Sequence, residues 1–540
     1  MEKRHNKVVF KAYHQNQLSL LPPSLDDLIA ANHPVRVVDG VVEQVDISSL
    51  LKAYKGGGNS SYHPKMLLKV LIYGYLKNIY SSRKLEEQLQ ENIHFMWLGG
   101  MNTPDHSTIN EFRGVRLADS IKVIFGEVVM LLAEAGLVDI KETYTDGTKI
   151  EANANRYTFV WGKSIKTNKE RIKKQLESLW TYVSEVYKKE SEEAPEKPDF
   201  TEISAEKVSQ AVQEINEALK KKEVDKKVKD KLKYAEKTWP NKLKEYEQKE
   251  AILDGRNSYS KTDHDATFMR MKEDHMKNGQ LKPGYNVQAS SSDKIVVNYS
   301  VGQTTADTSL YIKHMESYED LYGCYPESDT ADAGYGSEEN YQFLEDHGVD
   351  AYVKYPNFHR EQTARFQKDI HHKENLYYNE EQDCYYCPMG QKMSKISTSK
   401  QQTTSGFVQI INSYQARNCE HCPLRGMCHK SKSNRIVQRN ANLERSKEKA
   451  KKRLTSERGR EKRGQRCVDI EGAFAQLKHN KHFKRFFLRG LDKVNIELGL
   501  VFTSMNIARG ISKMAASKGD SLLKIKDLSQ FMTFMEQKTA

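Results

Sequence analysis

Apolar residues recur at helical spacing through residues 25–135, which predicts a block of packed helices. The segment HPKMLLKVLIYGYLKNI (63–79) illustrates the pattern, because one of its helical faces is apolar. In PDHSTINEFR (104–113), Thr108 and Glu111 match a capping box and predict the start of another helix. The apolar face of the first segment consists of Leu67, Val70, Leu71 and Leu76.

The middle of the chain changes to strands that alternate with helices. β-Branched and aromatic residues in ETYTDGTKIEA (142–152) predict a strand. PGYNVQAS and KIVVNYSVGQTTAD, joined by SSSDK, predict a hairpin of two strands. A strand ending at Asp332, a helix and the strand DAYVKY follow. Residues 164–250 are Lys/Glu-rich, typical of a solvated helical hairpin. The alternation predicts an α/β fold with a helical insertion.

Shifts in composition divide the chain into five parts. Clustered cysteines mark one boundary, and a strongly basic run marks the next. The expected parts are a helical domain (1–135), an α/β core (136–163 and 251–377), a charged helical insertion (164–250), a cysteine-rich insertion (378–430), and a basic segment with C-terminal helices that complete the core (431–540).

The chain of 540 residues is too long for one hydrophobic core, which predicts roughly two to four domains. Its net charge of +12 and pI of about 9.0 favour a polyanionic partner, nucleic acid first, although many soluble proteins are mildly basic. A mean hydropathy of -0.76 suits a cytoplasmic protein. Residues 1–20 show no signal-peptide core, and no apolar run is long enough to span a bilayer. Without a secretion signal, the seven cysteines favour reduced thiols or metal ligands over disulfides.

Two aspartates, Asp329 and Asp332, lie close together in DTADAGYGS, where a strand gives way to a glycine turn. Residues three apart on a strand face opposite sides, so only one of the two points into a shared site. Asp332 is the better placed, because open α/β sheets carry their sites at the carboxyl ends of strands. A turn acid that caps the next helix is the alternative. Asp329 is expected to cap or to be solvated. Asp146 lies inside an earlier strand, directly before Gly147.

Glu471 lies on a predicted helix, beside its apolar stripe. Ile470, Phe474 and Leu477 form that stripe, and Glu471 and Lys478 lie seven residues apart on a parallel polar stripe. A helix of this kind either aims the acid at a sheet or is an ordinary amphipathic helix with a surface Glu.

Five cysteines in the cysteine-rich insertion show metal-ligand spacing. Cys384 with Cys387 and Cys419 with Cys422 form two C-x2-C pairs, as in a zinc ribbon, and Cys428 follows. The GFVQIINSYQ segment between the pairs is able to form strands. Reduced surface thiols are the alternative to a structural Zn²⁺ site, and which four cysteines would bind is open.

The densest basic run covers residues 429–466. Acids are few there, which favours contact with phosphates over a merely solvated helix. In the helical block, Trp97 within FMWLGG either packs in the core or wedges between bases, and core packing is the expected role.

The ordered segments YTDGTKIEANA, ADAGYGSEEN and IEGAFAQLK resemble those of DDE transposases of bacterial insertion sequences, the cut-and-paste type. HPKMLLKVLIYGYL and PDHSTINEFR resemble the N-terminal helical domain of that group. SKTDHDATFM and GYNVQAS resemble its core strands, and FKRFFLRGLDKVNIELGLVFTSMNIAR resembles its C-terminal helix. The resemblance covers nearly the whole chain apart from residues 164–250 and the C-terminal end. It implies a ribonuclease-H-like mixed-sheet core, an N-terminal DNA-binding domain, and a bacterial, nucleoid-associated protein.

The resemblance also implies that Asp146, Asp332 and Glu471 are a catalytic triad that binds Mg²⁺ or Mn²⁺. The chemistry fits, because phosphodiester cleavage needs charge neutralisation at the attacking and leaving oxygens. Two divalent ions held by clustered carboxylates provide it. Mg²⁺ prefers oxygen ligands and keeps several waters, so three acids suffice.

The resemblance further implies that Lys478 contacts DNA near the cut end. The family pattern Tyr-x2-Arg-x3-Glu-x6-Lys is only partly present, because Gly464 and Cys467 stand at its Tyr and Arg positions. Arg463 and Arg466 are the candidates to replace the missing Arg as DNA contacts. How the second strand is cut, and whether a DNA hairpin forms, stay open.

The resulting expectation is a transposase. It would bind the ends of its element as a homodimer on double-stranded DNA, cut with metal-activated water, and join the 3′-hydroxyl ends to target DNA. The alternatives are a catalytically silent relative that binds DNA as a repressor, and a plain metal-dependent nuclease that cuts without joining. No membrane partner is expected.

Overall fold

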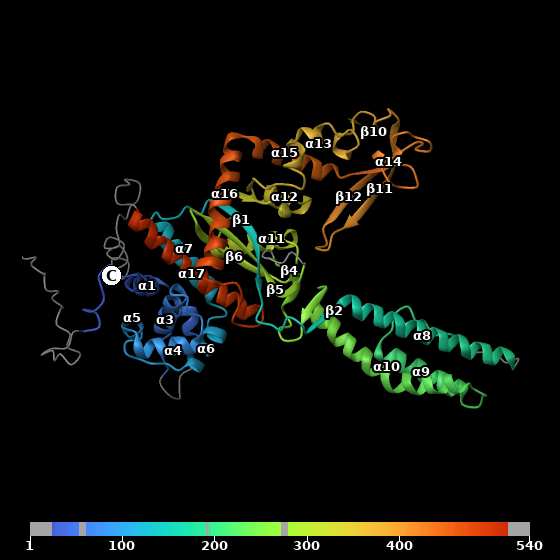
Figure 1. Cartoon of the computed structure of the whole chain (residues 1–540), viewed down its shortest axis with the longest axis horizontal. Helices are drawn as coiled ribbons and strands as arrows, with labels where there is room; N and C mark the ends of the chain where they lie inside the picture. The colour runs from blue at the N-terminus through green and yellow to red at the C-terminus, as the bar shows by residue number, and fades with distance from the viewer. Residues whose placement is uncertain are drawn as a thin grey trace, which may run out of the picture.

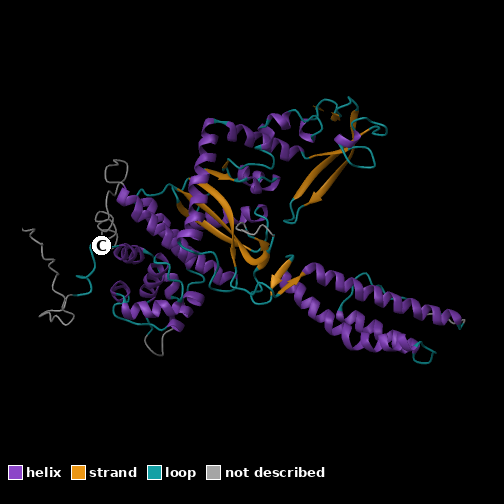
Figure 2. Cartoon of the chain, in the orientation of Figure 1, coloured by secondary structure: helices purple, strands orange, loops and turns teal. Residues whose placement is uncertain are grey.

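The computed structural model describes residues 24–52, 54, 61–190, 193, 195–271 and 279–516 (Figure 1). Residues 1–20, in which the sequence shows no signal-peptide core, lie outside this part of the chain. A helical block, a sheet, a projecting helical arm and a second sheet make up the fold (Figure 2). No helix in the described ranges is long and apolar enough to cross a membrane.

The predicted helical block is present. Its Trp97 packs against the apolar core, as expected, with the Arg36 guanidinium over its ring. The capping box was wrong, because Asp105 is the N-cap of α6 and its carboxylate accepts the Thr108 N–H at 2.7 Å. The helices are α1 (Pro34–Gln44), α2 (Ser48–Leu51), α3 (Pro64–Leu76), α4 (Ser82–Glu91), α5 (Ile93–Leu98), α6 (His106–Glu111), the π-helical turn η1 (Phe112–Arg116) and α7 (Ile121–Glu134).

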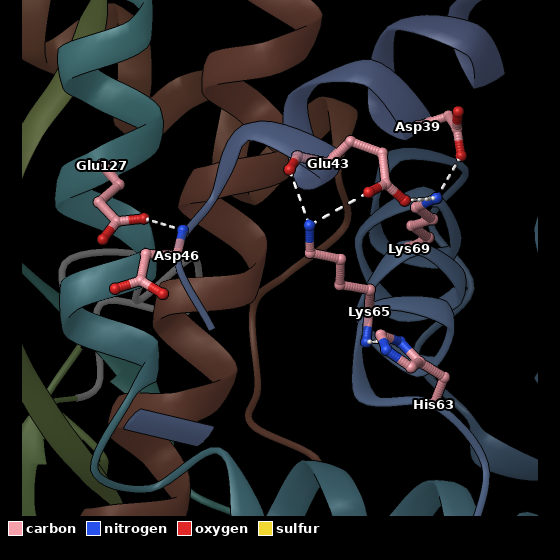
Figure 3. A network of polar contacts seen from close by, with 7 residues as sticks. All are labelled: Asp39, Glu43, Asp46, His63, Lys65, Lys69 and Glu127. Carbon is pink, nitrogen blue, oxygen red and sulfur yellow. Dashed lines mark hydrogen bonds and ion pairs between the residues drawn. The ribbon is translucent and has the colours of Figure 1, made fainter. Parts of the chain in front are cut away.

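Polar contacts tie α1 to two neighbouring helices (Figure 3). Lys65 and Lys69 of α3 both reach the Glu43 carboxylate of α1, at 3.1 and 2.5 Å. After α1, the Asp46 N–H donates to the Glu127 carboxylate of α7 at 2.8 Å. Surface ion pairs contribute about 1 kcal/mol or less each, so they orient the helices while the apolar core supplies most of the stability.

A six-stranded mixed sheet lies at the centre of the molecule, with strand order β4-β5-β1-β7-β8 and β6 paired to β5. β1 runs parallel to β7 and antiparallel to β5, and β5 and β6 form the predicted hairpin. The α/β class and the mixed sheet are therefore confirmed. The strands are β1 (Glu142–Glu151), β4 (Thr267–Arg270), β5 (Leu281–Ser292), β6 (Ile295–Gly302), β7 (Ser328–Ala331) and β8 (Asp350–Ala351).

Helices far apart in the chain cover this sheet. α16 lies against β1 and β5, whereas α17 contacts β6 as well as α3 and α7. The C-terminal helix therefore joins the helical block to the sheet through one continuous apolar core. The helices that accompany the sheet are α11 (Tyr311–Tyr322), α12 (Glu338–Asp346), α16 (Glu457–Ala475) and α17 (Leu491–Ala516).

The charged insertion forms an arm that projects from the rest of the molecule (Figure 1). It has its own apolar core, in which Trp180 and Trp239 are buried, so it is a bundle of three helices rather than the expected hairpin. The short strands β2 (Phe159–Trp161) and β3 (Ser258–Ser260) pair at its base. The helices are α8 (Gly162–Lys189), α9 (Ala205–Leu219) and α10 (Lys226–Leu253).

The cysteine-rich insertion forms an antiparallel five-stranded sheet with strand order β13-β12-β11-β10-β9. The segment GFVQIINSYQ supplies β12, as the sequence suggested, and the basic run forms α15 and the start of α16. The elements are β9 (Tyr378–Asn379), β10 (Cys384–Tyr386), β11 (Lys392–Gln402), β12 (Val408–Ala416), β13 (Ile436–Arg439), α13 (Ala364–Gln367), α14 (Arg425–Cys428) and α15 (Ala441–Thr455).

A buried acid in α17 makes the stability of this fold depend on pH. The Glu497 carboxylate accepts the N–H groups of Phe487 and Leu488 at 2.9 and 3.1 Å. Burial raises the pKa of Glu497 from 4.5 to about 7, although the nearby Arg113 favours the charged form. An acid whose pKa is raised by folding stabilises the fold below pH 4.5, and this contribution is lost as the pH rises through about 7.

The variant Glu497→Gln is expected to remove this pH dependence. Between about pH 5 and pH 8, the free energy of unfolding of the wild type should fall by roughly 3 kcal/mol relative to the variant. Urea unfolding at several pH values measures the difference. Asp492→Asn, at an exposed position in the same helix, is the control and should follow the wild type. Parallel pH profiles for the wild type and Glu497→Gln would show that another group titrates.

Candidate active site

Asp146 and Asp332 lie on neighbouring parallel strands. β1 and β7 pair with Thr145 opposite Ala331, so each aspartate is the next residue along its own strand. Alternation of side chains then puts both carboxylates on the same side of the sheet. The Asp332 side chain forms no capping hydrogen bond in the turn η3 (Ala333–Tyr335), and its carboxylate lies 3.6 Å from the Lys354 ammonium. Asp332, at the end of β7, therefore faces the Lys354 ammonium and does not cap the turn η3 through its side chain.

Glu471 reaches the same region from α16. Ile470, Phe474 and Leu477 are buried, as the apolar stripe predicts, and α16 contacts β1 and β7. The Glu471 side chain keeps 49 % exposure and accepts a hydrogen bond from Arg466 Nη2 at 2.9 Å. Glu471 is therefore half-exposed, and its carboxylate contacts Arg466, which in turn contacts Asp146 of β1. This placement agrees better with an acid directed at the sheet than with an ordinary surface Glu.

Arg466 connects the three acids. Its side chain is only 5 % exposed, and Nη1 lies 3.4 Å from Asp146 while Nη2 bonds Glu471. Burial alone would lower the pKa of Arg466, but the negative charges of Asp146, Asp332 and Glu471 outweigh burial and raise it. Arg466 Nε and Nη1 have no hydrogen-bond partner among the described residues. The three acids therefore act on one buried guanidinium, and two of its nitrogen atoms, Nε and Nη1, are without a hydrogen-bond acceptor among the described residues.

The three acids are of the residue type that binds divalent metal ions, but their placement differs from that of a formed metal site. Within the described ranges, no group of three or more His, Cys, Asp and Glu side chains is arranged to hold a metal ion. Asp146 and Glu471 instead share the Arg466 cation. Carboxylate oxygens are the ligands that Mg²⁺ and Mn²⁺ prefer, so the residue types suit a divalent ion, although the three acids are not gathered into a metal site in this structure.

Asp329 is placed differently from the sequence expectation. It was expected to cap a helix or to be solvated, but it is fully buried on the opposite face of β7. Its carboxylate accepts hydrogen bonds from the Thr143 and Thr145 hydroxyls at 2.7 Å and from the Tyr311 hydroxyl at 2.5 Å. These bonds offset the cost of burial, and burial raises the pKa of Asp329. Through its hydrogen bonds with the two threonines of β1, Asp329 of β7 links the two strands on the side of the sheet opposite Asp146 and Asp332.

A fourth acid lies beside the site. Asp307 follows β6, and its carboxylate accepts from the side-chain amides of Asn286 at 2.7 Å and Gln288 at 3.1 Å. A Cβ at Gly147 would lie 2.8 Å from Asp307 Oδ1 and 3.0 Å from the Tyr335 hydroxyl, so only glycine fits directly after Asp146. In the sequence, Asp307 follows a predicted strand, and an acid at the carboxyl end of a strand is the feature that also singled out Asp332.

Lys354 is a further charged residue that the sequence pattern did not single out. It follows β8, its N–H donates to the Ala331 carbonyl at 3.2 Å, and its side chain is largely buried. Because it lies in a segment that reads simply as a strand, DAYVKY, no local signal distinguishes it. The parallel pairing of β7 with β8 brings it to Asp332.

The basic residues predicted to contact DNA differ in exposure. The Arg463 guanidinium lies over the Phe358 ring, 5.2 Å from its centroid, and is partly exposed. Lys478 lies in the π-helical turn η6 (Gln476–Asn480) and is only 7 % exposed. Contact of Arg463, Arg466 and Lys478 with DNA stays a prediction.

The zinc-ribbon prediction is not supported. Cys384, Cys387, Cys419, Cys422 and Cys428 are free thiols, and they form no metal-binding group within the described ranges. The physical reason lies in Arg435, whose guanidinium donates to Cys428 Sγ at 2.8 Å and whose N–H donates to Cys419 Sγ at 3.4 Å. Cys384 is fully buried, and Cys419 belongs to the small apolar core under the second sheet. The insertion is held by β pairing and that core.

Comparison with protein families finds two matches. The family described as "Transposase DDE domain" matches residues 386–511, which include α16 with Glu471 and Arg466. The family described as "Transposase domain (DUF772)" matches residues 23–114, the greater part of the helical block. No curated protein and no solved structure matches the chain.

The class of protein follows from the site and the first of these matches: the chain carries a DDE transposase domain, and its mixed sheet is consistent with the ribonuclease-H-like core of that class. With the second match at the other end of the chain, the two matches support an insertion-sequence DDE transposase.

Proposed function

We propose that this protein binds the ends of its own mobile element, cleaves the DNA there and joins the freed 3′-hydroxyl ends to target DNA. Hydrolysis of a phosphodiester leaves a 3′-hydroxyl and a 5′-phosphate. In the joining step that 3′-hydroxyl attacks a target phosphodiester, so one such bond forms as another breaks and no energy source is needed. We further propose that two copies act together, one at each element end.

The observation that carries this proposal is the convergence of Asp146, Asp332 and Glu471 on Arg466. Arg466 contacts Asp146 and Glu471 directly, and the charge of Asp332 acts on it as well, so acids from two parallel strands and one helix lie near one cation. These three residues would hold Mg²⁺ or Mn²⁺. The bound ions would neutralise charge at the attacking and leaving oxygens of the phosphodiester.

The surrounding side chains support this assignment in three ways. Asp329 holds β1 and β7 in register, so that Asp146 and Asp332 stay side by side. Arg466 and Lys354 place positive charge next to the acids, where it offsets their mutual repulsion and attracts a phosphate. The side chains of Gln288, Asp307 and Tyr335 fill the space beside Gly147, so the backbone that follows Asp146 is closely packed.

The test is cleavage and joining of a supercoiled plasmid that carries the DNA flanking the gene, with Mg²⁺. Nicked and joined products together are the expected result. Cutting without joining would indicate a plain nuclease, and binding without cutting would indicate a silent, repressor-like relative. Either outcome would overturn the proposed function.

A further inference from the structure

The helical arm carries a groove whose lining is unlike that of a solvated helix bundle. The groove has a volume of about 690 Å³ and lies between α8 and α10. The apolar side of α8, including Leu176 and Trp180, faces the core of the arm, so the opposite side faces solvent. The groove is lined chiefly by Lys166, Thr167, Arg171, Lys174 and Ser178 of α8 and Lys231 of α10.

The groove extends toward the base of the arm. A second hollow of about 420 Å³ shares Thr167 with it and is also lined by Lys163, Ser164 and Trp161. Trp161 belongs to β2, whose partner β3 contacts β4 at the edge of the central sheet. The basic surface of α8 therefore begins next to the sheet that carries the candidate active site, and runs outward from it (Figure 1).

The charges of this surface are not balanced within the arm. Among the described residues that line the larger groove, Glu170 is the sole acid. Among the described residues, ion pairs of the arm lie outside the groove lining, between Lys169 and Glu250, Lys249 and Glu245, and Lys222 and Glu190. Glu170 lies one turn from Lys166 and from Lys174, and one acid against four cations leaves the lining with an excess of three positive charges.

The distribution of charge among the three helices also indicates a positively charged surface on α8 and α10. Basic residues outnumber acidic ones in α8 and α10, whereas acidic residues outnumber basic ones in α9, which contributes nothing to the groove lining. The short hydroxyl side chain of Ser178, between the cations, lets a phosphate approach the helix closely and accept a hydrogen bond. The surface therefore fits a regular polyanion.

We infer that the groove between α8 and α10 binds the phosphate backbone of double-stranded DNA outside the cut site, without reading its sequence. The inference rests on the proposed function and assigns a task to the arm. From Lys163 to Ser178 the surface spans roughly 24 Å, the length of about 7 base pairs. The arm thus acts as a clamp on the duplex flanking the cleavage position.

The test replaces the cations that line the groove with glutamine, in the full-length protein. The variant carries Lys166→Gln, Arg171→Gln, Lys174→Gln and Lys231→Gln. Each phosphate contact contributes about 0.9 to the slope of log K against log salt concentration, so the slope should become shallower by about 3 to 4. Hydroxyl-radical footprints on end DNA should shorten by about 7 base pairs on one side.

A matched control removes the same charge from exposed lysines of α9 and α10 that do not line the groove. It carries Lys207→Gln, Lys233→Gln, Lys237→Gln and Lys244→Gln. The control should keep the wild-type footprint and most of the wild-type salt slope. All eight substitutions are at positions outside the apolar core of the arm, and circular dichroism checks that both variants fold.

The outcomes separate the clamp from the proposed function. If the wild type cuts and joins DNA while the groove variant and the control show the same slope and footprint, the clamp is wrong and the proposed function stands. If the wild type neither cuts nor joins, the proposed function fails, whereas a shortened footprint of the groove variant alone would still support the DNA-binding surface.

Discussion

Asp332→Asn is expected to lower the rate of DNA cleavage by at least about 10³-fold while leaving end binding and thermal stability close to those of the wild type. The change keeps the size of the side chain and removes the charge that Asp332 presents at the tip of β7. Half of this side chain is exposed, and the oxygen of the asparagine amide would still face the largely buried Lys354 ammonium. Single-turnover cleavage of end DNA measures the rate, and a gel-shift assay measures binding.

Asp146→Asn and Glu471→Gln should have the same effect, and combining them should add little, because residues that act as a unit are not additive. Glu327→Gln is the matched control, since Glu327 precedes β7 and forms an exposed ion pair with Lys141. Asp329 is unsuitable as a control, because its removal would leave buried hydroxyls unpaired. Full cleavage activity in the three single variants would overturn the assignment of the site.

Arg466→Ala is expected to destabilise the metal-free protein by about 3 kcal/mol, because it leaves Asp146 and its neighbours without their shared cation. Adding Mg²⁺ should restore part of this loss, because a divalent ion supplies the missing positive charge to the same carboxylates. The expected result is therefore a larger increase of Tm with Mg²⁺ in the variant than in the wild type, measured by differential scanning fluorimetry.

Arg458→Ala is the control for Arg466→Ala. Arg458 lies on the same helix as Arg466, is 61 % exposed and pairs with Glu142 of β1. Exposed pairs contribute about 1 kcal/mol or less. This control should lose little stability and should respond to Mg²⁺ as the wild type does. An equal Mg²⁺ response in wild type and Arg466→Ala would show that the three carboxylates do not take up the ion together.

Local pattern was a good guide wherever one element decides the outcome. Alternation along a strand separates Asp329 from Asp332, and the structure has them on opposite faces of β7. The apolar stripe of α16 is buried as its spacing predicts, which directs Glu471 to the edge of the sheet. The helical block and the β5–β6 hairpin also follow from spacing and turn residues.

Local pattern was a poor guide wherever partners come from distant segments. The burial of Asp329 depends on hydroxyl donors from β1 and α11, and these donors decide that a carboxylate can lie inside the core. Spacing along one strand carries no information about such donors.

Periodicity along the chain was enough to determine the fold class, the helical block and the order of the acid-bearing segments, because period and turn chemistry are properties of consecutive residues. The tertiary structure decided the rest. The parallel register of β1 and β7 puts Asp146 beside Asp332, and the packing of α16 brings Arg466 against Asp146 and Glu471. The path of α8 along α10 likewise turns separate lysines into one groove. Each of these sites depends on the distance between side chains from elements far apart in the chain, and only packing sets that distance.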